Sequence, residues 1–380
     1  MRLNPVLEGL RTYPFVRLRE AREAAEARGM RVIDFGVGEP REETPAFIRR
    51  ALAAAVEDEP VSGYPAAEGL PELRAAVAGW VGRRFGASLD PDREVVPTLG
   101  SKEAIFSLAQ VLGDRGDAAA FGVPGYPVPE RGALFAGLEP VPLALTEEHG
   151  WLPDLDAVAW DRLAILWINT PGNPTGVTAS LEFLEEAASR CRAAGAVLAS
   201  DEAYSELWFS GDPPVSALQL ADRTGVLAFN TLSKRSSMPG YRCGFVAGDP
   251  ELVAALKRFR PNIGTAPPAF VQRAGIAAWG DEEHVRETRD RYRAKREIVL
   301  PALVRAGLRP AGGDASFFLW MGVDDDEAFA TRLLSELGIV VTPGSYLGAP
   351  GYVRAALVPT VEECHRAAGL LATGSRAAPR

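Results

Sequence analysis

Short apolar runs alternate along the chain with longer stretches in which apolar and polar residues mix at helical spacing. The apolar runs predict strands at 94–99, 118–121, 163–168, 196–200, 226–230 and 243–247. The mixed stretches predict helices at 15–28, 45–55, 71–85, 101–112, 180–194 and 251–258. Nearly continuous apolar strands that alternate with helices are typical of a mostly parallel sheet with helices on both faces. We therefore expect an α/β fold.

A long charged stretch at 282–299 predicts the helix that leads into a second, smaller unit. Beyond it, the pattern predicts strands at 316–321, 340–342 and 352–357 and helices at 326–337 and 361–371. We expect four parts in all. They are an N-terminal segment 1–44 that contributes to the small domain, a large domain 45–281, a small α+β domain 282–373 and a disordered tail 374–380.

The composition is that of an ordinary globular protein, and it narrows the possible partners. Of the 380 residues, 47% are hydrophobic and 24% are charged, and this length suggests about two domains. The net charge of −9 argues against nucleic acid or an anionic membrane surface as the main partner. No apolar run approaches the roughly 20 residues of a membrane helix, and the first residues carry no signal-peptide core.

Cysteine and histidine are scarce. Cys191, Cys243 and Cys364 lie far apart and have no CxxC spacing, so we expect neither a disulfide framework nor a zinc site. Three scattered histidines leave little material for a histidine-based metal site or a Ser-His-Asp triad. These features suit a cytoplasmic protein without a bound metal.

Several of the predicted strands end in polar loops. The loops lie at 100–102, 124–127, 169–176 and 231–234, and Asp201 ends another strand. In open α/β sheets, ligands bind beyond the carboxyl ends of the strands. We therefore expect one site that is assembled from all of these loops.

If the chemistry needs a primary amine, four lysines can supply it: Lys102, Lys234, Lys257 and Lys295. Lys257 and Lys295 lie in charged helical stretches, which predicts that both face solvent. Lys102 opens a predicted helix, where it suits either an anion at the helix N-terminus or plain solvation. Lys234 follows an apolar strand and lies among hydroxyl side chains, so it is the candidate reactive amine.

The surroundings of Lys234 suit a phosphate as well as an amine. A lysine that forms a Schiff base must be partly neutral near pH 7, and burial at a strand end promotes this. Arg242 can hold a phosphate in a bidentate pair, and the hydroxyls of Thr231 and Ser233 can donate to the same group. The helix that begins at Ser101 adds backbone N–H donors. A phosphate cup beside a reactive amine is what pyridoxal phosphate requires.

Two further residues allow more than one interpretation. The ring nitrogen of pyridoxal phosphate needs a carboxylate partner, because the protonated ring is the better electron sink. Asp201 can supply that carboxylate, or it can cap a following helix. Asn173 can belong to the site, or it can only shape the turn at 171–176, for which Asn, Pro and Gly are well suited.

Taken in order, these motifs resemble those of the class I/II aminotransferases of pyridoxal-phosphate fold type I. They are Tyr64 with GLPELR at 69–74, GSKE at 100–103, PGNPTG at 171–176, SDEAY at 200–204, SK at 233–234 with GYRCG at 240–244, and YVR at 352–354. The resemblance covers most of the chain. It implies a large domain with a mostly parallel seven-stranded sheet, a smaller α+β domain, and a homodimeric enzyme that uses pyridoxal phosphate.

The resemblance also implies a role for each residue around the cofactor ring. Lys234 holds the cofactor covalently and later moves a proton between the substrate α-carbon and the cofactor. Asp201 pairs with the ring nitrogen, and Asn173 and Tyr204 bond to the phenolic oxygen of the ring. Tyr126 stacks on the ring face.

The same resemblance implies how the phosphate and the substrate are held. The residues around the phosphate are Ser101, Lys102, Thr231, Ser233 and Arg242. Tyr64 reaches the phosphate of the neighbouring subunit. Arg354 binds the substrate α-carboxylate in a bidentate pair beside Asn173, with Gly38 closing over it.

Stretches that extend beyond the cofactor site, such as 233–240, 244–249 and 343–347, are most similar to bacterial N-succinyldiaminopimelate aminotransferase. This implies amino transfer from glutamate to N-succinyl-2-amino-6-oxopimelate in lysine biosynthesis. The distal carboxylates of these substrates need further cations, for which the candidates are Arg11, Arg17, Arg235 and Lys102. Alternatives are an aspartate, alanine or aromatic aminotransferase, a lyase that cleaves a carbon–sulfur bond, and a non-catalytic ligand-sensing domain.

Overall fold

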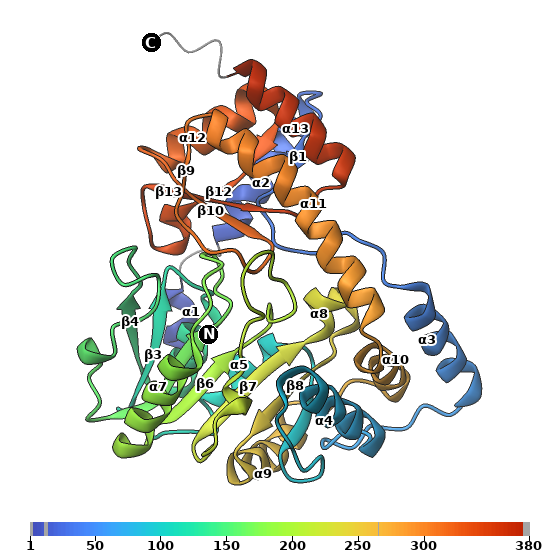
Figure 1. The fold of residues 1–380 in the computed structure, drawn as a ribbon. Helices are drawn as coiled ribbons and strands as arrows, with labels where there is room; N and C mark the ends of the chain where they lie inside the picture. The colour runs from blue at the N-terminus through green and yellow to red at the C-terminus, as the bar shows by residue number, and fades with distance from the viewer. Residues whose placement is uncertain (1–2, 11–13, 265, 375–380) are drawn as a thin grey trace.

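Two bodies make up the chain in the computed structural model, which describes residues 3–10, 14–264 and 266–374 (Figure 1). The larger body contains a seven-stranded sheet, and the long helix α11 (Glu283–Arg305) leads from it into the smaller one. Within these residues, no helix has the length and apolar character needed to span a membrane.

The large sheet has the strand order β2–β8–β7–β6–β5–β3–β4. Its strands are β2 (Val95–Thr98), β3 (Ala118–Val123), β4 (Glu139–Ala144), β5 (Leu163–Asn169), β6 (Val197–Asp201), β7 (Val226–Thr231) and β8 (Gly244–Gly248). Neighbouring strands are parallel except at β8, which runs antiparallel to both β2 and β7. The predicted α/β fold with a mostly parallel seven-stranded sheet is confirmed.

The hydrophobic pattern does not predict β4, because this strand lies at the edge of the sheet. It pairs with β3 alone, and every residue except Leu143 is exposed or half-buried. Its sequence contains Pro140 and Pro142, which an edge strand tolerates because one side makes no ladder hydrogen bonds. An exposed, proline-containing strand has no apolar run to mark it.

Helices flank the large sheet. They are α3 (Ala46–Asp58), α4 (Pro71–Phe85), α5 (Ser101–Leu108), α6 (Val128–Ala136), α7 (Leu181–Ala194), α8 (Leu232–Arg235), α9 (Pro250–Phe259) and α10 (Ala269–Gly280). Pro71 in the first turn and Gly86 (φ 69°) just past the end set the bounds of α4, as its sequence predicts. The pattern misses α6 and α10. Helix α10 packs against both α3 and α4, so its apolar residues face several directions and blur the helical period.

The small body contains an antiparallel sheet in the order β12–β13–β10–β9. Its strands are β9 (Arg309–Pro310), β10 (Phe318–Gly322), β12 (Thr342–Pro343) and β13 (Tyr352–Ala356). Its helices are α11, α12 (Asp326–Arg332), which a π-helix at Leu333–Leu337 continues, and α13 (Val361–Gly374). The predicted tail at 374–380 lies outside the described residues beyond Gly374, which still belongs to α13.

Part of the N-terminal segment packs on the small body. The segment forms α1 (Pro5–Gly9), α2 (Pro14–Ala27) and β1 (Ile33–Asp34). Helix α2 contacts the π-helix at Leu333–Leu337 and β1 pairs in parallel with β11 (Ile339–Val340), whereas α1 is drawn beside the strands of the large body (Figure 1). The prediction of one strand at 340–342 is therefore wrong. The segment changes sheets at Val341, because β11 pairs with β1 whereas β12 pairs with β13. The domain boundaries at 44/45 and 281/282 stay predictions.

Lys295 is buried, contrary to the prediction of a solvated helix face. Its side chain is fully buried in α11, where its ammonium pairs with the carboxylate of Glu42 from the N-terminal segment. Charged neighbours in the sequence predict an exposed lysine only where no carboxylate from a distant segment pairs with that lysine. Lys257 is partly exposed, and its ammonium donates to the carbonyl oxygen of Asp92 at 2.6 Å.

Candidate active site

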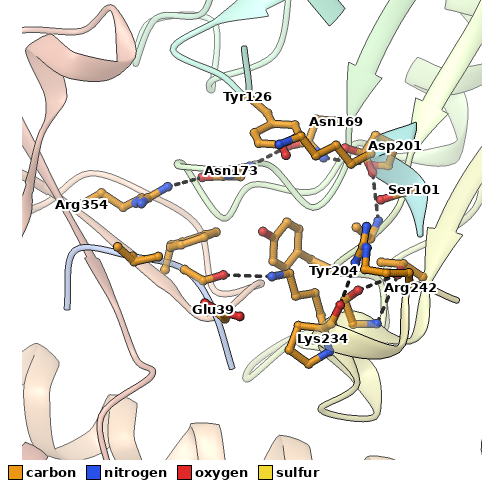
Figure 2. Close-up of a pocket in the computed structure, with 18 residues that line it drawn as sticks. Glu39, Ser101, Tyr126, Asn169, Asn173, Asp201, Tyr204, Lys234, Arg242 and Arg354 are labelled. Carbon is orange, nitrogen blue, oxygen red and sulfur yellow. Dashed lines mark hydrogen bonds between the residues drawn. The ribbon is translucent and has the colours of Figure 1, made fainter. Parts of the chain in front are cut away.

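A cavity of about 500 Å³ lies where the carboxyl ends of β5, β6 and β7 face the small body (Figure 2). These strand ends contribute Asn169, Asp201 and Thr231, and the small body contributes Phe318 and Arg354. Loops and short helices contribute Val37, Gly38, Glu39, Ser101, Lys102, Tyr126, Asn173, Ala203, Tyr204, Ser233, Lys234, Pro239 and Arg242. The polar strand ends thus meet at one site, as the sequence predicts.

Every residue predicted to bind the cofactor or the substrate α-carboxylate, except Tyr64, lines this cavity. Tyr64 precedes α4 and is fully exposed. The structure therefore brings the predicted residues together in position. Their individual roles stay proposals.

Lys234 stands on α8, a single helical turn directly after β7, and its side chain reaches into the cavity (Figure 2). The turn is capped by the side chain of Thr231, which accepts from the N–H of Ser233. Lys234 Nζ donates a 2.9 Å hydrogen bond to the carbonyl oxygen of Gly38. It also lies 5.4 Å from the ring centre of Phe317.

Burial lowers the pKa of Lys234 to about 8. The charge of Glu39 opposes this shift, whereas the cations Arg354 and Arg242 add to it. An amine of pKa about 8 is about one-tenth neutral at pH 7, against less than about one-thousandth for an ordinary lysine. The neutral amine is the form that attacks an aldehyde. Lys234 therefore has the property that Schiff-base chemistry needs.

Asp201 ends β6 as a buried carboxylate on the cavity wall. Burial raises its pKa to about 6, although the N–H of Ala203 and the charge of Lys234 act in the opposite direction. The bond from Ala203 N to Asp201 Oδ1 is 3.3 Å long, so the carboxylate also shapes the turn after the strand. A buried carboxylate is stabilised by an adjacent cation, and a protonated ring nitrogen in the cavity would provide one.

Glu202, the next residue, points away from the cavity and gives a testable pH dependence. Its Oε1 accepts hydrogen bonds from Ala217 N at 2.8 Å and Ser200 Oγ at 3.0 Å. Burial raises its pKa from 4.5 to about 7 despite these bonds. The folded state therefore holds this proton more tightly than the unfolded state. The resulting loss of stability develops as the pH rises from about 4.5 to about 7 and is complete above that.

Glu202→Gln keeps a hydrogen-bond acceptor and removes the buried charge. We expect urea unfolding of the holoenzyme to give the variant a gain in unfolding free energy, relative to wild type, that is larger at pH 8 than at pH 5 by about 2–3 kcal/mol. A difference that stays constant with pH would contradict a titrating Glu202.

The far end of the cavity is built to accept an anion. Helix α5 begins there, after Gly100 (φ 73°) at its N-cap. A Cβ on Gly100 would lie only 2.4 Å from Arg242 Nη2, so glycine lets the guanidinium lie against the helix start. Arg242 is held by bonds from Nη1 to Pro239 O at 2.8 Å and from Nη2 to Leu99 O at 3.0 Å. A guanidinium beside a helix N-terminus favours a phosphate.

Hydroxyl groups and Lys102 surround the same end. Thr231 Oγ1 and Ser233 Oγ lie 2.9 Å apart, and both residues line the cavity. Lys102 also lines the cavity, although the residue as a whole is exposed. Partial burial lowers the pKa of its ammonium, and the cations Arg131 and Arg242 add to this effect. Like charges gathered around one space favour an anion there.

Arg354 lies on β13 at the opposite end of the cavity from Arg242 (Figure 2). It is 2% exposed. Nη1 donates to Asn173 Oδ1 at 2.9 Å, Nη2 donates to Gly36 O at 2.7 Å, and the guanidinium lies 4.4 Å from the ring centre of Phe318. These contacts hold a buried guanidinium beside the cavity, which suits bidentate recognition of a carboxylate.

Six residues of the cavity wall are not among the predicted site residues: Val37, Glu39, Asn169, Ala203, Pro239 and Phe318. Three of them show why. Asn169 donates from Nδ2 to Asp201 O at 3.0 Å and accepts from Asn173 N at 2.7 Å, so it orients two predicted site residues. The strand-end rule that selects Asp201 could have found it. Glu39 follows Gly38 in the N-terminal segment, and its isolated charge gives no signal. Phe318 is an apolar residue in a strand and cannot be told from the core.

The structure separates the candidate cations for the distal carboxylates into those that line the cavity and those that do not. Arg235 is wrong for this role, because its side chain is buried outside the cavity and pairs with Glu282 at 3.2 Å. Arg17 is exposed and does not line the cavity, and Arg11 lies outside the described residues. Lys102 is the remaining candidate on the cavity wall.

Asp281, His284 and Ser236 form a hydrogen-bonded row behind the helical turn that carries Lys234. The scarcity of histidine had argued against a catalytic Ser-His-Asp triad. His284 Nδ1 lies 2.6 Å from Asp281 Oδ1, and His284 Nε2 lies 2.9 Å from Ser236 Oγ. Ser236 is completely buried, so a substrate cannot reach its hydroxyl. The row supports the turn and does not form a hydrolytic site.

The cavity as a whole fits pyridoxal phosphate. An amine of lowered pKa, a buried carboxylate and an end that favours anions surround one space. The Arg242 end would hold the phosphate, Asp201 the ring nitrogen, and Lys234 the aldehyde carbon. The Arg354 end would then remain for the substrate.

Comparison with known proteins gives consistent matches over nearly the whole chain. The family model described as aminotransferase class I and II matches residues 30–371. An LL-diaminopimelate aminotransferase from Dehalococcoides mccartyi is 37% identical over 383 residues, which cover 98% of each sequence. The crystal structure of an aminotransferase from Neisseria meningitidis has a TM-score of 0.91 at 37% identity, covering 98% of this chain and all of that one. A Thermus thermophilus aspartate aminotransferase, a single mutant, has a TM-score of 0.90 at 28% identity, with 98% and 100% covered.

Proposed function

Because the chain belongs to the class I and II aminotransferase family, we propose that it transaminates LL-diaminopimelate, with glutamate and 2-oxoglutarate as the second pair. As a member of this family it is a pyridoxal-phosphate-dependent enzyme. One observation carries the choice of substrate: a relative that matches over 98% of its length is an LL-diaminopimelate aminotransferase. An amino-acid substrate also suits a cavity that has the guanidinium of Arg354 at the end away from Arg242.

When bound, pyridoxal phosphate accepts and returns the amino group and draws electrons from the substrate α-carbon. In our proposal, Lys234 holds the cofactor and afterwards moves a proton at the α-carbon. The carboxylate of Asp201 keeps the ring nitrogen protonated. Asn173 and Tyr204 donate to the phenolic oxygen, and Tyr126 lies against the ring.

In this proposal, the cofactor phosphate and the substrate α-carboxylate bind at opposite ends of the cavity. Ser101, Thr231, Ser233 and Arg242 hold the phosphate, together with Lys102. Arg354 holds the α-carboxylate beside Asn173, while the segment at Gly38 covers the substrate and excludes water. Since these groups are preorganised by protein hydrogen bonds, they lose little freedom when the substrate binds.

The proposal includes a homodimer in the cytoplasm. Tyr64 is the predicted contribution of one subunit to the phosphate end of the other. Its complete exposure supports this, because a side chain that serves a neighbouring subunit stands out from its own.

N-succinyl-LL-2,6-diaminopimelate is the second candidate substrate. It is supported by the similarity of the stretches at 233–240, 244–249 and 343–347 to enzymes that act on this compound. The two candidates differ at the distal nitrogen, which is an ammonium in LL-diaminopimelate and an uncharged amide in the succinylated compound.

An amino-donor panel tests the proposal. The purified holoenzyme is given 2-oxoglutarate with LL-diaminopimelate, its N-succinyl derivative, aspartate, alanine or phenylalanine, and glutamate formation is measured. We expect kcat/KM for LL-diaminopimelate to exceed that for the last three by about tenfold or more, or about 1.4 kcal/mol in transition-state binding.

Other outcomes of the panel would decide against the proposal in distinct ways. A preference for the succinylated compound selects the second candidate. A preference for aspartate or phenylalanine rejects both. Release of pyruvate and ammonia from cystathionine without an amino acceptor would indicate a lyase, and absence of any turnover would favour a ligand-sensing role.

A further inference from the structure

A second cavity adjoins the candidate active site on the side of the N-terminal segment. Its volume is about 410 Å³, and it shares Val37 and Glu39 with the first cavity as lining residues. Arg19, Arg22 and Arg41 also line it. The two spaces thus meet at the segment around Gly38, and the second one is rich in guanidinium groups.

The second cavity has more positive than negative charge. Its arginines face one buried carboxylate, Asp34, whose Oδ2 lies 3.1 Å from Arg22 Nη1 and 3.4 Å from Arg41 Nη2. Arg22 Nε is buried and has no hydrogen-bond partner, and the nearest carboxylate oxygen of Glu26 lies 3.8 Å away. Arg22 and Arg41 thus share the Asp34 carboxylate, and Glu26 faces only Arg22 Nε, at a distance too long for a hydrogen bond. Two guanidinium groups with an unused donor between them can accept a further carboxylate.

Gly36 sets the separation between this cluster and Arg354. The carbonyl oxygen of Gly36 accepts from Arg354 Nη2 at 2.7 Å, and its N–H donates to Asp34 Oδ1 at 2.7 Å. Because Gly36 makes both hydrogen bonds, the distance from Arg354 Nη2 to the Asp34 carboxylate is at most the two bond lengths plus the span of one residue, or about 9 Å. The carboxylate carbons of an extended heptanedioate are about 7–8 Å apart, and those of glutamate about 5 Å. A C7 diacid therefore has the length to contact both ends.

Glu39 adds a negative charge where the two cavities meet. In LL-diaminopimelate the distal end carries an ammonium next to its carboxylate. Glu39 beside Arg22 and Arg41 offers the complementary pair of charges. A succinylated distal nitrogen is uncharged, and glutamate has no distal nitrogen, so neither would use this carboxylate.

From this geometry we infer that Arg22, Arg41 and Glu39 form a distal subsite for the second amino-acid end of the substrate. The two arginines bind its carboxylate, and Glu39 binds its ammonium. The inference rests on the proposed function, because it deepens the choice of LL-diaminopimelate. It also makes Glu39 the residue that distinguishes this substrate from its succinylated form.

The arginine part is tested by ligand binding, without turnover. Pimelate, which is a C7 diacid without amino groups, and the C5 diacid glutarate are titrated into the holoenzyme by calorimetry. We expect Arg41→Gln to raise the Kd of pimelate about tenfold or more, with the Kd of glutarate changing less than about threefold. Arg28→Gln, at an exposed position just after α2, is the matched control and should change neither value. Equal effects on both diacids, or none, would reject the subsite.

The Glu39 part is tested by relative turnover. Glu39→Gln should lower kcat/KM for LL-diaminopimelate about tenfold more than for glutamate or the succinylated compound. The comparison within one variant removes any general effect on Lys234, since all substrates meet the same amine. Equal losses for all substrates would overturn the assignment of Glu39. If wild type fails to use LL-diaminopimelate, the proposed function fails and the ammonium role with it, whereas the pimelate titration still decides the arginine part.

Discussion

Replacing Lys234 with alanine is expected to abolish transamination and to remove the visible absorption band of the lysine-bound cofactor. Lys234 alone combines a place on the cavity wall at a strand end with a pKa lowered to about 8 by burial. The variant loses both the covalent attachment and the group that moves a proton at the α-carbon. Proton transfer by a positioned side chain is worth about 10²–10⁴-fold, so we expect a total loss of at least about 10³-fold in kcat.

Absorption spectra and single-turnover kinetics check this expectation. Lys257→Ala is the matched control, because Lys257 is a partly exposed lysine on α9 that does not line the cavity. It should keep both the band and the activity. A Lys234→Ala protein that retains the band would show that another amine carries the cofactor.

Replacing Arg354 with alanine should raise KM steeply while the cofactor remains bound. The variant loses a charge-assisted bidentate pair with the substrate α-carboxylate, which costs about 2–4 kcal/mol, or a factor of about 30–1000 in kcat/KM. The substitution does not alter Arg242, the proposed phosphate ligand at the opposite end of the cavity. Steady-state kinetics together with the cofactor content of the purified protein measure the two effects separately.

Arg354→Lys refines this test. Lysine keeps the charge but not the planar fork that donates to Asn173 and Gly36, so we expect an intermediate loss. If Arg354→Ala leaves KM unchanged, another cation holds the α-carboxylate. A loss of cofactor would instead indicate that Arg354 supports the fold of the site.

The strands of the large sheet were predictable because they are buried on both faces. Strands such as β6 and β7 are buried along their whole length, so the positions before their polar ends are apolar or small and the run is visible in the sequence. The edge strand β4 is not buried on both faces, so it has no apolar run that would predict it. The same holds for α10, whose several contact faces leave no single apolar stripe.

The part of the site that lies at strand ends was also predictable. The chemistry demands a lysine, a carboxylate and small polar donors, and parallel strands bring their carboxyl ends to one edge. Asp201 and Lys234 could therefore be selected by residue type and position alone. Glu39 and the arginines of the second cavity could not, because they approach the site from the N-terminal segment.

The wrong assignments of Lys295 and Arg235 share one physical cause. Lys295 was expected in solvent and Arg235 at the substrate, yet both are buried because carboxylates from other segments meet them. Whether a charged side chain is solvated depends on the electrostatic partner and the packing around it. These are properties of contacts between segments that are distant in the chain.

The sequence by itself determined the α/β class, and it selected Lys234 as the candidate reactive amine together with most of the polar residues that line the cavity. These depend on local residue patterns and on the chemical requirements of single groups. The tertiary structure alone decided which charges are buried, how Arg354 meets the strand ends, and that a second cationic cavity opens beside Glu39. Such features arise from packing across residues far apart in the chain, and the free energy of a charge depends on that packing.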